Sequence, residues 1–441
     1  MVLSAKNQAP RTKNVFFMKD TDISQITQEV TLLAKKAKEA AHELALLDSG
    51  GKNETLLKIA EVIAASSEKI LKANSLDLAA AAKAGIGQAL LDRLSLNEAR
   101  IAGMAEGLRQ IAKLPDPTGE VIREWTAENG LKIKQVRVPL GVIGMIYEAR
   151  PNVTAEAAGL CLKAGNAVIL RGGSEAFNSN KVLVELIGKA IAESPVRAGA
   201  VQLLPPQDRR SITVLSRLNG FVDLIVARGS EEMVKEVTAN ATVPVLGHGK
   251  GLCAIYIDKS ADLESAVKIA YNAKVQRPGV CNAMETLLVH QDVMFEVVPK
   301  IAELYTQAGV EIRGDGHITG LVPQAKFATD EDWETEFHDL VVAMKVVKNV
   351  EEAIAHIHRY GSGHTDSIIT DDKKTAELFL KSVDSSCVMV NASTRLHDGA
   401  VFGFGSEIGI STNKLHARGT MGLRELTTTK FIVEGQGQIR E

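Results

Sequence analysis

Residues 142–170 read VIGMIYEARPNVTAEAAGLCLKAGNAVIL, and this stretch decides the fold. A short apolar run, Val142–Ile146, precedes a helical pattern near Thr154–Lys163 and a second apolar run, Ala167–Leu170. Strands that are apolar throughout and alternate with helices are typical of a parallel sheet buried on both faces. The stretch therefore predicts an α/β domain.

The same alternation continues along the chain and predicts a second α/β domain. In the first series we expect strands at 201–204, 222–227 and 253–257, with helices near 180–192 and 231–239. In the second series, between Asp262 and Val390, we expect strands at 286–289, 341–347, 367–369 and 388–390, with a helix at 350–359. Two doubly covered sheets are the result.

Between the first helices and the first sheet lies a hairpin pattern. Val121–Trp125 and Leu131–Gln135 alternate charged and apolar residues and flank Asn129-Gly130, a favoured hairpin turn. Near the C-terminus, Lys430–Val433 predicts one more short strand. We expect an exposed ribbon that gains by pairing with another subunit.

The N-terminal hundred residues predict helices. Leu56, Ile59 and Ile63 follow helical spacing, and Ser95 with Glu98 predicts a capping box. Before these helices, the apolar cluster Val15–Met18 is too short for a signal peptide. We interpret residues 1–20 as a frayed tail, with a transit-type extension as the open alternative.

Composition narrows the class of protein. The 441 residues contain 51 Lys and Arg against 54 Asp and Glu, a net charge of −3, which argues against a nucleic-acid binder that neutralises phosphates. No run of 18 apolar residues predicts a membrane-spanning helix. Four cysteines form no disulfide framework, so we expect reduced thiols in a cytoplasmic protein.

One cysteine differs in context from the other three. Cys161, Cys253 and Cys387 lie within or beside apolar elements and are interpreted as buried, inert thiols. Cys281 follows a Pro-Gly turn and lies four residues after Arg277, a context that favours an accessible and stabilised thiolate. From the residues alone, a nucleophile and an inert thiol are equally supported at position 281.

Histidines and glycine loops carry weaker signals. His356, His358 and His364 lack the spacing of metal ligands, so we expect them on a solvated surface and expect no zinc. Gly247–Gly251 precedes a strand, which favours a tight turn over a phosphate loop. Gly229-Ser230 follows a strand and opens a helix, where a phosphate group can bind.

Long motifs resemble the aldehyde dehydrogenase superfamily over most of the chain. They are residues 138–154, 162–171, 276–286, 390–395 and 402–412. The resemblance implies an α/β fold with two Rossmann-type parallel-sheet domains and a β-ribbon oligomerisation element. It implies a cofactor-binding domain at 1–117 and 142–254, a catalytic domain at 255–425, and an oligomerisation ribbon at 118–141 and 426–441.

Within the superfamily, the motifs look like those of a branch that reduces L-glutamyl 5-phosphate to its semialdehyde with NADPH in proline biosynthesis. The implied catalytic residues are Cys281 as nucleophile and Asn152 as oxyanion donor. For the cofactor, the resemblance implies Arg171, Gly229, Ser230 and Glu336. Arg150, Arg277 and Arg395 are candidate substrate-binding cations, with a salt bridge near the site as an equally supported role for each.

One departure from the superfamily is informative. Hydrolytic members carry a glutamate that activates the deacylating water, whereas the matching stretch Pro244–Lys250 contains none. Such a base would hydrolyse the thioester before a hydride reached it, so its loss suits a reductase. Another acylating dehydrogenase, using coenzyme A or a different acyl phosphate, and a non-catalytic scaffold remain the alternatives.

The same resemblance sets the expected partners. They are a small-molecule substrate, a second copy of the chain in a homodimer or homotetramer, and a functional link to glutamate 5-kinase. We expect no nucleic-acid or membrane partner.

Overall fold

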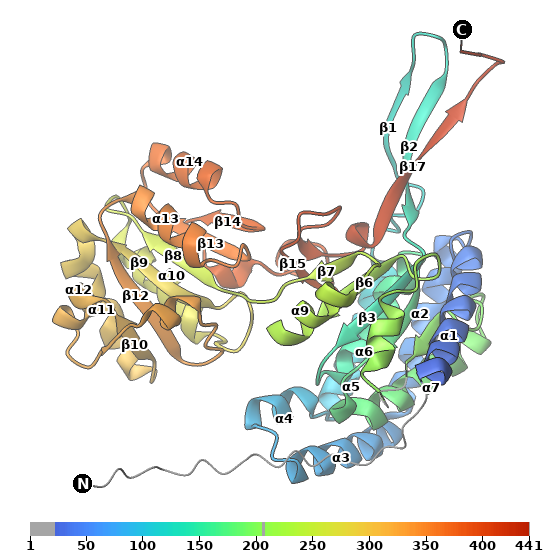
Figure 1. The fold of residues 1–441 in the computed structure, drawn as a ribbon, viewed down its shortest axis with the longest axis horizontal. Coiled ribbons are helices and arrows are strands. Elements are labelled where there is room, and N and C mark those ends of the chain that lie inside the picture. The colour runs from blue at the N-terminus through green and yellow to red at the C-terminus, as the bar shows by residue number, and fades with distance from the viewer. Residues whose placement is uncertain (1–22, 205–207, 441) are drawn as a thin grey trace.

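The computed structural model describes residues 23–204 and 208–440. The cluster Val15–Met18 and the expected tail lie outside these residues. Two parallel sheets lie side by side, and a narrow ribbon extends away from them (Figure 1). The fold class predicted from the alternation of strands and helices is confirmed.

The first sheet is built on the stretch that opens at Val142. Its five strands are all parallel, in the order β5-β4-β3-β6-β7. Their bounds are β3 Val142–Tyr147, β4 Ala167–Arg171, β5 Val201–Leu203, β6 Leu224–Arg228 and β7 Val245–Gly247. The helices that follow these strands are α6 Pro151–Lys163, α7 Phe177–Ala192, α8 Arg210–Leu215 and α9 Glu231–Asn240.

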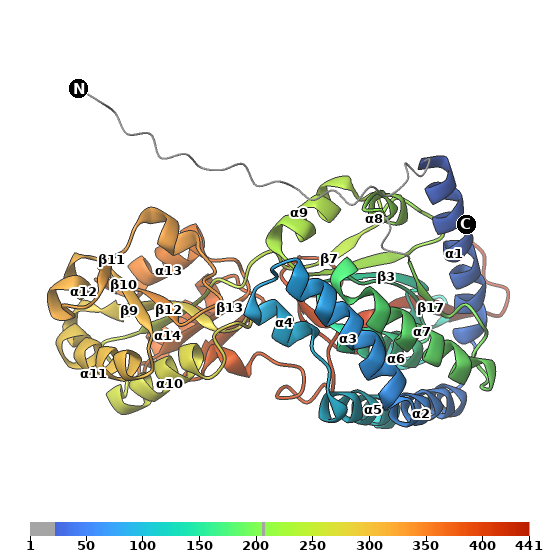
Figure 2. The ribbon, with the colours of Figure 1, turned by 90° about the horizontal axis from the view of Figure 1, so that it is seen from below.

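Side chains of β3 alternate between two hydrophobic cores. Ile143 and Met145 face the core shared with α2, α5, α6 and α7, whereas Val142 and Ile146 face the core shared with α1, α8 and α9. Figure 2 shows the sheet between these two helical layers. Both faces are covered, which explains why every residue of β3 is apolar or glycine and buried.

The N-terminal segment supplies five helices, as its spacing predicts. They are α1 Ile23–Leu44, α2 Ser49–Ala65, α3 Ser67–Lys83, α4 Gln88–Leu94 and α5 Glu98–Lys113. The predicted capping box at Ser95 is wrong. Asn97 caps α5 instead, because its side chain lies next to the helix start and accepts a hydrogen bond from the Arg100 N–H.

The second sheet has seven parallel strands in the order β11-β10-β12-β9-β8-β13-β14. Their bounds are β8 Cys253–Ile257, β9 Met284–His290, β10 Glu311–Gly314, β11 Lys326–Phe327, β12 Val341–Val347, β13 Thr365–Ile369 and β14 Cys387–Val390. One face packs on α10 Leu263–Val275, α11 Met294–Gln307 and α12 Gly316–Leu321. The other face packs on α13 Val350–Tyr360 and α14 Lys373–Ser382.

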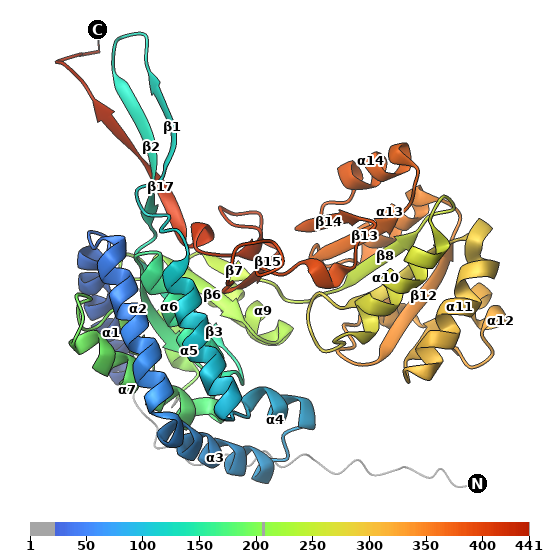
Figure 3. The ribbon, with the colours of Figure 1, turned by 180° about the vertical axis from the view of Figure 1, so that it is seen from behind.

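The ribbon is a three-stranded antiparallel sheet that protrudes from the first domain (Figure 3). Its strands are β1 Val121–Thr126, β2 Lys132–Pro139 and β17 Thr427–Glu434, with β2 in the centre. The predicted hairpin and the predicted C-terminal strand are both confirmed as elements. Trp125 and Phe431 meet edge to face at 6.1 Å on this ribbon.

The segment before the ribbon packs on the first domain. This segment, residues 408–426, covers the end of the predicted catalytic domain at 255–425 and the first residue of the predicted ribbon range 426–441. It carries the two-stranded sheet of β15 Gly409–Ser411 and β16 Gly419–Met421. Ile408, Met421 and Leu426 are buried in the core of the first domain, because the chain must cross back there to reach the ribbon. No helix among the described residues is long and apolar enough to cross a membrane.

Candidate active site

A cleft of about 1590 Å³ receives residues from both domains. It lies at the carboxyl ends of β3, β4 and β6, where open parallel sheets bind ligands. All nine residues that the sequence singles out as site residues line it: Arg150, Asn152, Arg171, Gly229, Ser230, Arg277, Cys281, Glu336 and Arg395. The fold thus brings together residues that are up to 245 positions apart.

Cys281 lies on the loop between α10 and β9. Its side chain is partly exposed, whereas Cys161 and Cys253 are fully buried. Burial raises the pKa values of both of those thiols and raises that of the half-buried Cys387 to about 11. Cys281 is therefore the thiol that differs in its environment, and the interpretation of the other three as unreactive fits their surroundings.

The environment of Cys281 favours its thiolate. Burial opposes ionisation, but the His364 imidazole and the Arg228 guanidinium outweigh it and lower the pKa of the Cys281 thiol. A thiolate is the nucleophilic form of cysteine. The loop therefore presents a thiol with a lowered pKa to the cleft.

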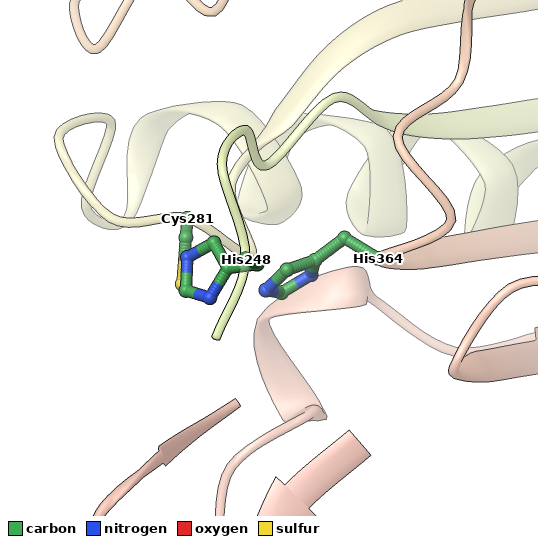
Figure 4. Close-up of side chains that lie close together, drawn as sticks. All are labelled: His248, Cys281 and His364. Carbon is green, nitrogen blue, oxygen red and sulfur yellow. The ribbon is translucent and has the colours of Figure 1, made fainter. Parts of the chain in front are cut away.

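His364 contradicts the expectation of a solvated surface. It immediately precedes β13 and is completely buried. Its Nδ1 lies 2.7 Å from the Thr365 hydroxyl, and the ring points toward Cys281 (Figure 4). The sequence missed this role, because the Gly-Ser-Gly turn before His364 indicates a surface loop and does not reveal the Cys281 loop packed against it.

The other two histidines of that group differ in their exposure to solvent. His358 is exposed, as expected, and His356 is buried between Trp333 and Tyr360, contrary to expectation. Both lie on α13, two residues apart, so they point to different faces of the helix. The face that carries His356 packs inward.

His248 completes the surroundings of the thiol. It lies directly after β7, in the stretch Pro244–Lys250, which contains no glutamate. Its Nδ1 donates to the Ile410 carbonyl at 2.8 Å, so the remaining lone pair is on Nε2. Burial lowers the pKa of His248, which keeps the ring neutral at neutral pH. The sequence gave no sign that its ring lies beside Cys281.

Guanidinium groups gather around the thiol. Burial and the neighbouring Arg228, Arg93 and Arg277 lower the pKa of Arg150 to about 10. The charged groups that act on Arg150 are thus other cations and the Cys281 thiol. Because no carboxylate is among them, the salt-bridge alternative is not supported for Arg150. An anion placed among these arginines would neutralise their mutual repulsion.

Two arginines are tied to the loop that carries Cys281. Arg93, from α4, donates to the Gly279 carbonyl at 2.9 Å, and Arg395 donates to the Gln276 side chain at 2.9 Å. Sequence reasoning missed Arg93 and Arg228. Arg228 adjoins the Gly229-Ser230 signal and could have been included with it, whereas Arg93 lies 186 residues from Gly279 and carries no local signal.

Asn152 lies in the first turn of α6 and is exposed to the cleft. The turn that leads into this helix is strained, because Ala149 has a φ of 36°, in the left-handed region. The Ala149 N–H donates to the Glu175 carboxylate at 2.6 Å. The turn thereby holds Arg150 and Asn152 on the cleft side of the sheet.

The far end of the cleft offers a second set of polar groups. Ser230 precedes α9, and its N–H and hydroxyl donate to the Glu148 carboxylate at 2.8 and 3.2 Å. At Gly229, a Cβ would meet the Met233 methyl at 2.5 Å and the Glu148 carboxylate at 2.6 Å. The helix start is therefore closely packed, and a larger residue at position 229 would require the Met233 and Glu148 side chains to move.

Two buried polar atoms in the cleft have no hydrogen-bond partner within the described residues: Arg171 Nε and Glu336 Oε1. Buried unpaired polar groups each cost about 1–3 kcal/mol, so such atoms indicate a missing ligand. A guanidinium donor and a carboxylate acceptor in one long cleft fit the phosphate and ribose groups of a dinucleotide. The residues present therefore fit a nicotinamide cofactor.

Comparison with known proteins identifies the family. The model of the aldehyde dehydrogenase family matches residues 21–336. The chain belongs to the aldehyde dehydrogenase family, a family of oxidoreductases that use a nicotinamide cofactor. The resemblance predicted from the motifs is confirmed.

Within that family the similar proteins are gamma-glutamyl phosphate reductases. The enzyme of Caldanaerobacter subterraneus subsp. tengcongensis is 52% identical over 413 residues, 94% of this chain and 100% of its own length. That of Carboxydothermus hydrogenoformans is 55% identical over 93% of this chain and 99% of its own. The crystal structure of gamma-glutamyl phosphate reductase from Thermotoga maritima superimposes with a TM-score of 0.91 at 47% identity, covering 94% of this chain and 100% of that one.

Proposed function

We propose that this protein reduces L-glutamyl 5-phosphate to L-glutamate 5-semialdehyde with NADPH, releasing phosphate, in proline biosynthesis. The observation that supports this most is the position of Cys281, a thiol with a lowered pKa on the edge of a cleft rich in arginine. The names of relatives that are 52% and 55% identical support the same substrate.

The first half of the proposed reaction forms a thioester. The Cys281 thiolate attacks the acyl carbon and a C–S bond forms. The bond between the acyl carbon and the bridging phosphate oxygen then breaks, and phosphate leaves. Arg150, Arg277 and Arg395 balance the charge of the phosphate and of the substrate α-carboxylate. The Asn152 amide and the Cys281 N–H stabilise the oxyanion of the tetrahedral intermediate.

The second half returns the thiolate. When bound, NADPH supplies the hydride that reduces the thioester carbon. Arg171, Gly229 and Ser230 would hold its adenosine and diphosphate groups, with Arg171 toward a 2′-phosphate, and Glu336 would hold the nicotinamide ribose. The oxyanion then collapses, the C–S bond breaks, the semialdehyde leaves, and Cys281 is again a thiolate beside His364.

The thioester must survive until it is reduced. The stretch Pro244–Lys250 contains no glutamate, and the lowered pKa of its His248 makes that residue a weak base for water. Its Nδ1 is committed to the Ile410 carbonyl, which fixes the ring in place. This environment favours a reductase over an enzyme that hydrolyses its acyl intermediate.

The alternative within the family is an acylating dehydrogenase that uses coenzyme A. An acetylating aldehyde dehydrogenase of Geobacillus thermoglucosidasius shares the fold, with a TM-score of 0.69 at 17% identity. That likeness concerns the fold alone. The arginines around Cys281 favour a phosphate leaving group over a thiol.

The reverse reaction separates these candidates. Enzyme, L-glutamate 5-semialdehyde and NADP⁺ are combined with either phosphate or coenzyme A, and reduced cofactor is followed by absorbance. We expect turnover with phosphate, none with coenzyme A, and less with NAD⁺ than with NADP⁺. Turnover that requires coenzyme A, or that proceeds equally without phosphate, would contradict the proposal.

The proposed setting is a cytoplasmic homodimer or homotetramer with a functional link to glutamate 5-kinase. The exposed ribbon of β1, β2 and β17 supports self-association, because its outer edges and the Trp125–Phe431 pair are unprotected in a single chain. Sedimentation of the full chain, compared with that of a Phe431→Glu variant, tests this. We expect an oligomer that the variant weakens.

A further inference from the structure

Cys281, His248 and His364 form a cluster that the proposed reaction uses only in part. They come from the Cys281 loop, the end of β7 and the start of β13 (Figure 4). One ligand atom from each, the Sγ and two ring nitrogens, lies within 4.8 Å of the other two. Among the described residues, this is the group of three or more histidine, cysteine or acidic side chains with the geometry to hold a metal ion.

Both imidazole rings are arranged like those of metal-ligating histidines, because one ring nitrogen of each is within hydrogen-bond distance of a protein oxygen and the other ring nitrogen is left to face a ligand. Nδ1 of His248 is held by the Ile410 carbonyl at 2.8 Å. Nδ1 of His364 is held by the Thr365 hydroxyl at 2.7 Å, and that hydroxyl also contacts Nδ1 of His397 at 2.7 Å. The Nε2 atoms are thereby left for a ligand.

His364 supplies an independent sign that something binds here. The residue is completely buried, and its Nε2 has no hydrogen-bond partner in the described chain other than the Cys281 thiol that it faces. A thiol is a weak hydrogen-bonding group, so this buried nitrogen is poorly satisfied without a ligand. A cation bound between the thiolate and the two rings would satisfy it.

The donor set selects the metal. A thiolate with two imidazoles suits Zn²⁺, whereas Mg²⁺ and Ca²⁺ prefer oxygen ligands. Ligand atoms of a tetrahedral zinc site are about 3.3–3.6 Å apart, so small side-chain rotations close the present cluster. Cys281 and His248 line the cleft, which leaves the fourth position open to a water molecule.

Nearby charges act on the cluster in both directions. Arg228 acts on Cys281 and His248, and Arg150 and Arg395 act on Cys281, and all three disfavour a cation, whereas the Glu336 carboxylate acts on Cys281 and His248 with the opposite sign. Glu407 adds a second negative group beside His248. The thiolate itself then gives the cluster the charge that zinc requires.

We propose that His248, Cys281 and His364 form a Zn²⁺ site whose occupation switches the enzyme off and shields its thiol. The metal binds the sulfur that attacks the substrate and withdraws its negative charge, so a zinc-bound Cys281 is a much weaker nucleophile and zinc competes with thioester formation. The expectation of no zinc came from sequence spacing, and spacing does not reveal ligands drawn from three separate elements. The inhibition rests on the proposed function, whereas the metal site itself does not.

Cobalt is the spectroscopic probe for this site. The full-length enzyme, freed of metal by a chelator, is titrated with Co²⁺, and thiolate-to-cobalt charge-transfer absorption is recorded. We expect one equivalent to bind with this absorption and Zn²⁺ to displace it. The absorption should vanish in Cys281→Ser and persist in Cys253→Ala, since the Cys253 sulfur contacts His364 at Nδ1 rather than at Nε2.

The histidines are tested by affinity. His248→Gln and His364→Asn should each weaken Co²⁺ binding at least tenfold, and the exposed His358→Gln should not. His248 is only partly buried, so its variant keeps the test valid should His364→Asn fail to fold. Unchanged affinity in His248→Gln, or absorption that survives in Cys281→Ser, would overturn the site.

Alkylation provides a readout that is independent of the substrate. Iodoacetamide labelling of Cys281, followed by peptide mass spectrometry, should slow at least tenfold with one equivalent of Zn²⁺ and recover with chelator. Labelling that zinc leaves unchanged would refute the proposal. Zinc protection in an enzyme that fails to reduce glutamyl phosphate would support the site and refute the proposed function.

Discussion

Two thiols on neighbouring segments of this protein have opposite properties. Cys253 begins β8 and is fully buried, and its sulfur lies 3.2 Å from the carbonyl oxygen of Cys281. Cys281 lies on a loop and is partly exposed. Burial raises the pKa of the first thiol, whereas His364 and Arg228 lower that of the second. Reactivity here depends on which atoms face the sulfur, since both thiols lie near the same histidine.

The largest expected effect compares the two thiols directly. Cys281→Ala should lower turnover at least about 10³-fold, because the nucleophile is lost. Cys253→Ala should retain at least a tenth of the activity, since it removes only a buried packing group. Steady-state rates of the reverse reaction with phosphate and NADP⁺ measure both. Equal losses of turnover in the two variants would contradict the assignment of Cys281 as the nucleophile.

The next effect concerns the oxyanion. Asn152 and Cys281 line the same cleft, and in the proposed reaction the Asn152 amide stabilises the oxyanion, so Asn152→Ala should lower kcat about 10²–10³-fold. KM for the semialdehyde should change little, because the amide acts chiefly on the tetrahedral intermediate. A matched exposed asparagine, Asn219, replaced by alanine should leave kcat unchanged. A loss confined to KM would place Asn152 in substrate binding instead.

The next smaller effect is the pH dependence of stability that comes from His356, a buried histidine remote from the thiol. Burial lowers the pKa of His356 to about 4, so the folded protein resists protonation that the unfolded chain accepts below about pH 6.5. The contribution of His356 to the free energy of unfolding is therefore most favourable above about pH 6.5 and declines as the pH falls toward 4. Between pH 7 and pH 5 this residue should lower the free energy of unfolding by about 2 kcal/mol.

His356→Phe should remove that loss, because a phenyl ring keeps the contacts with Trp333 and Tyr360 and does not titrate. Urea unfolding at both pH values measures the difference. His358→Gln, on the exposed face of the same helix, is the control. Identical pH dependence in His356→Phe and the unaltered protein would contradict the assigned pKa.

The smallest effect concerns the histidine beside the thiol. His364→Asn removes the imidazole that lowers the pKa of Cys281, so its alkylation at pH 7 should slow several-fold. Labelling of Cys253 should remain negligible in either protein, since that sulfur is buried. Unchanged kinetics at Cys281 would show that Arg228 alone activates the thiol.

The sequence predicted most of the elements that carry these groups. β8 and β12 begin and end at the predicted residues, because continuous apolar runs in a doubly covered sheet leave little ambiguity. The order of the strands could not be read, since it depends on contacts between distant segments. The return of residues 408–426 to the first core was missed for the same reason.

The candidate residues were found from the sequence where a local pattern pointed to them. Cys281 and Asn152 lie in long motifs and Gly229 lies at a strand-to-helix turn, and the fold places all three in one cleft. His364, His248 and Arg93 gave no local signal, because their roles arise from loops that meet only in the folded chain. A sequence pattern that is typical of a surface loop therefore does not show whether a side chain is buried in the folded protein.

Acylation of the Cys281 sulfur can be tested directly. Enzyme incubated with L-glutamate 5-semialdehyde and NADP⁺, without phosphate, is quenched with acid, digested and analysed by peptide mass spectrometry. We expect a glutamyl thioester on the peptide that contains Cys281, removed when phosphate is added before the quench. An acyl group on any other residue, or reduced cofactor formed with no adduct on Cys281, would contradict it.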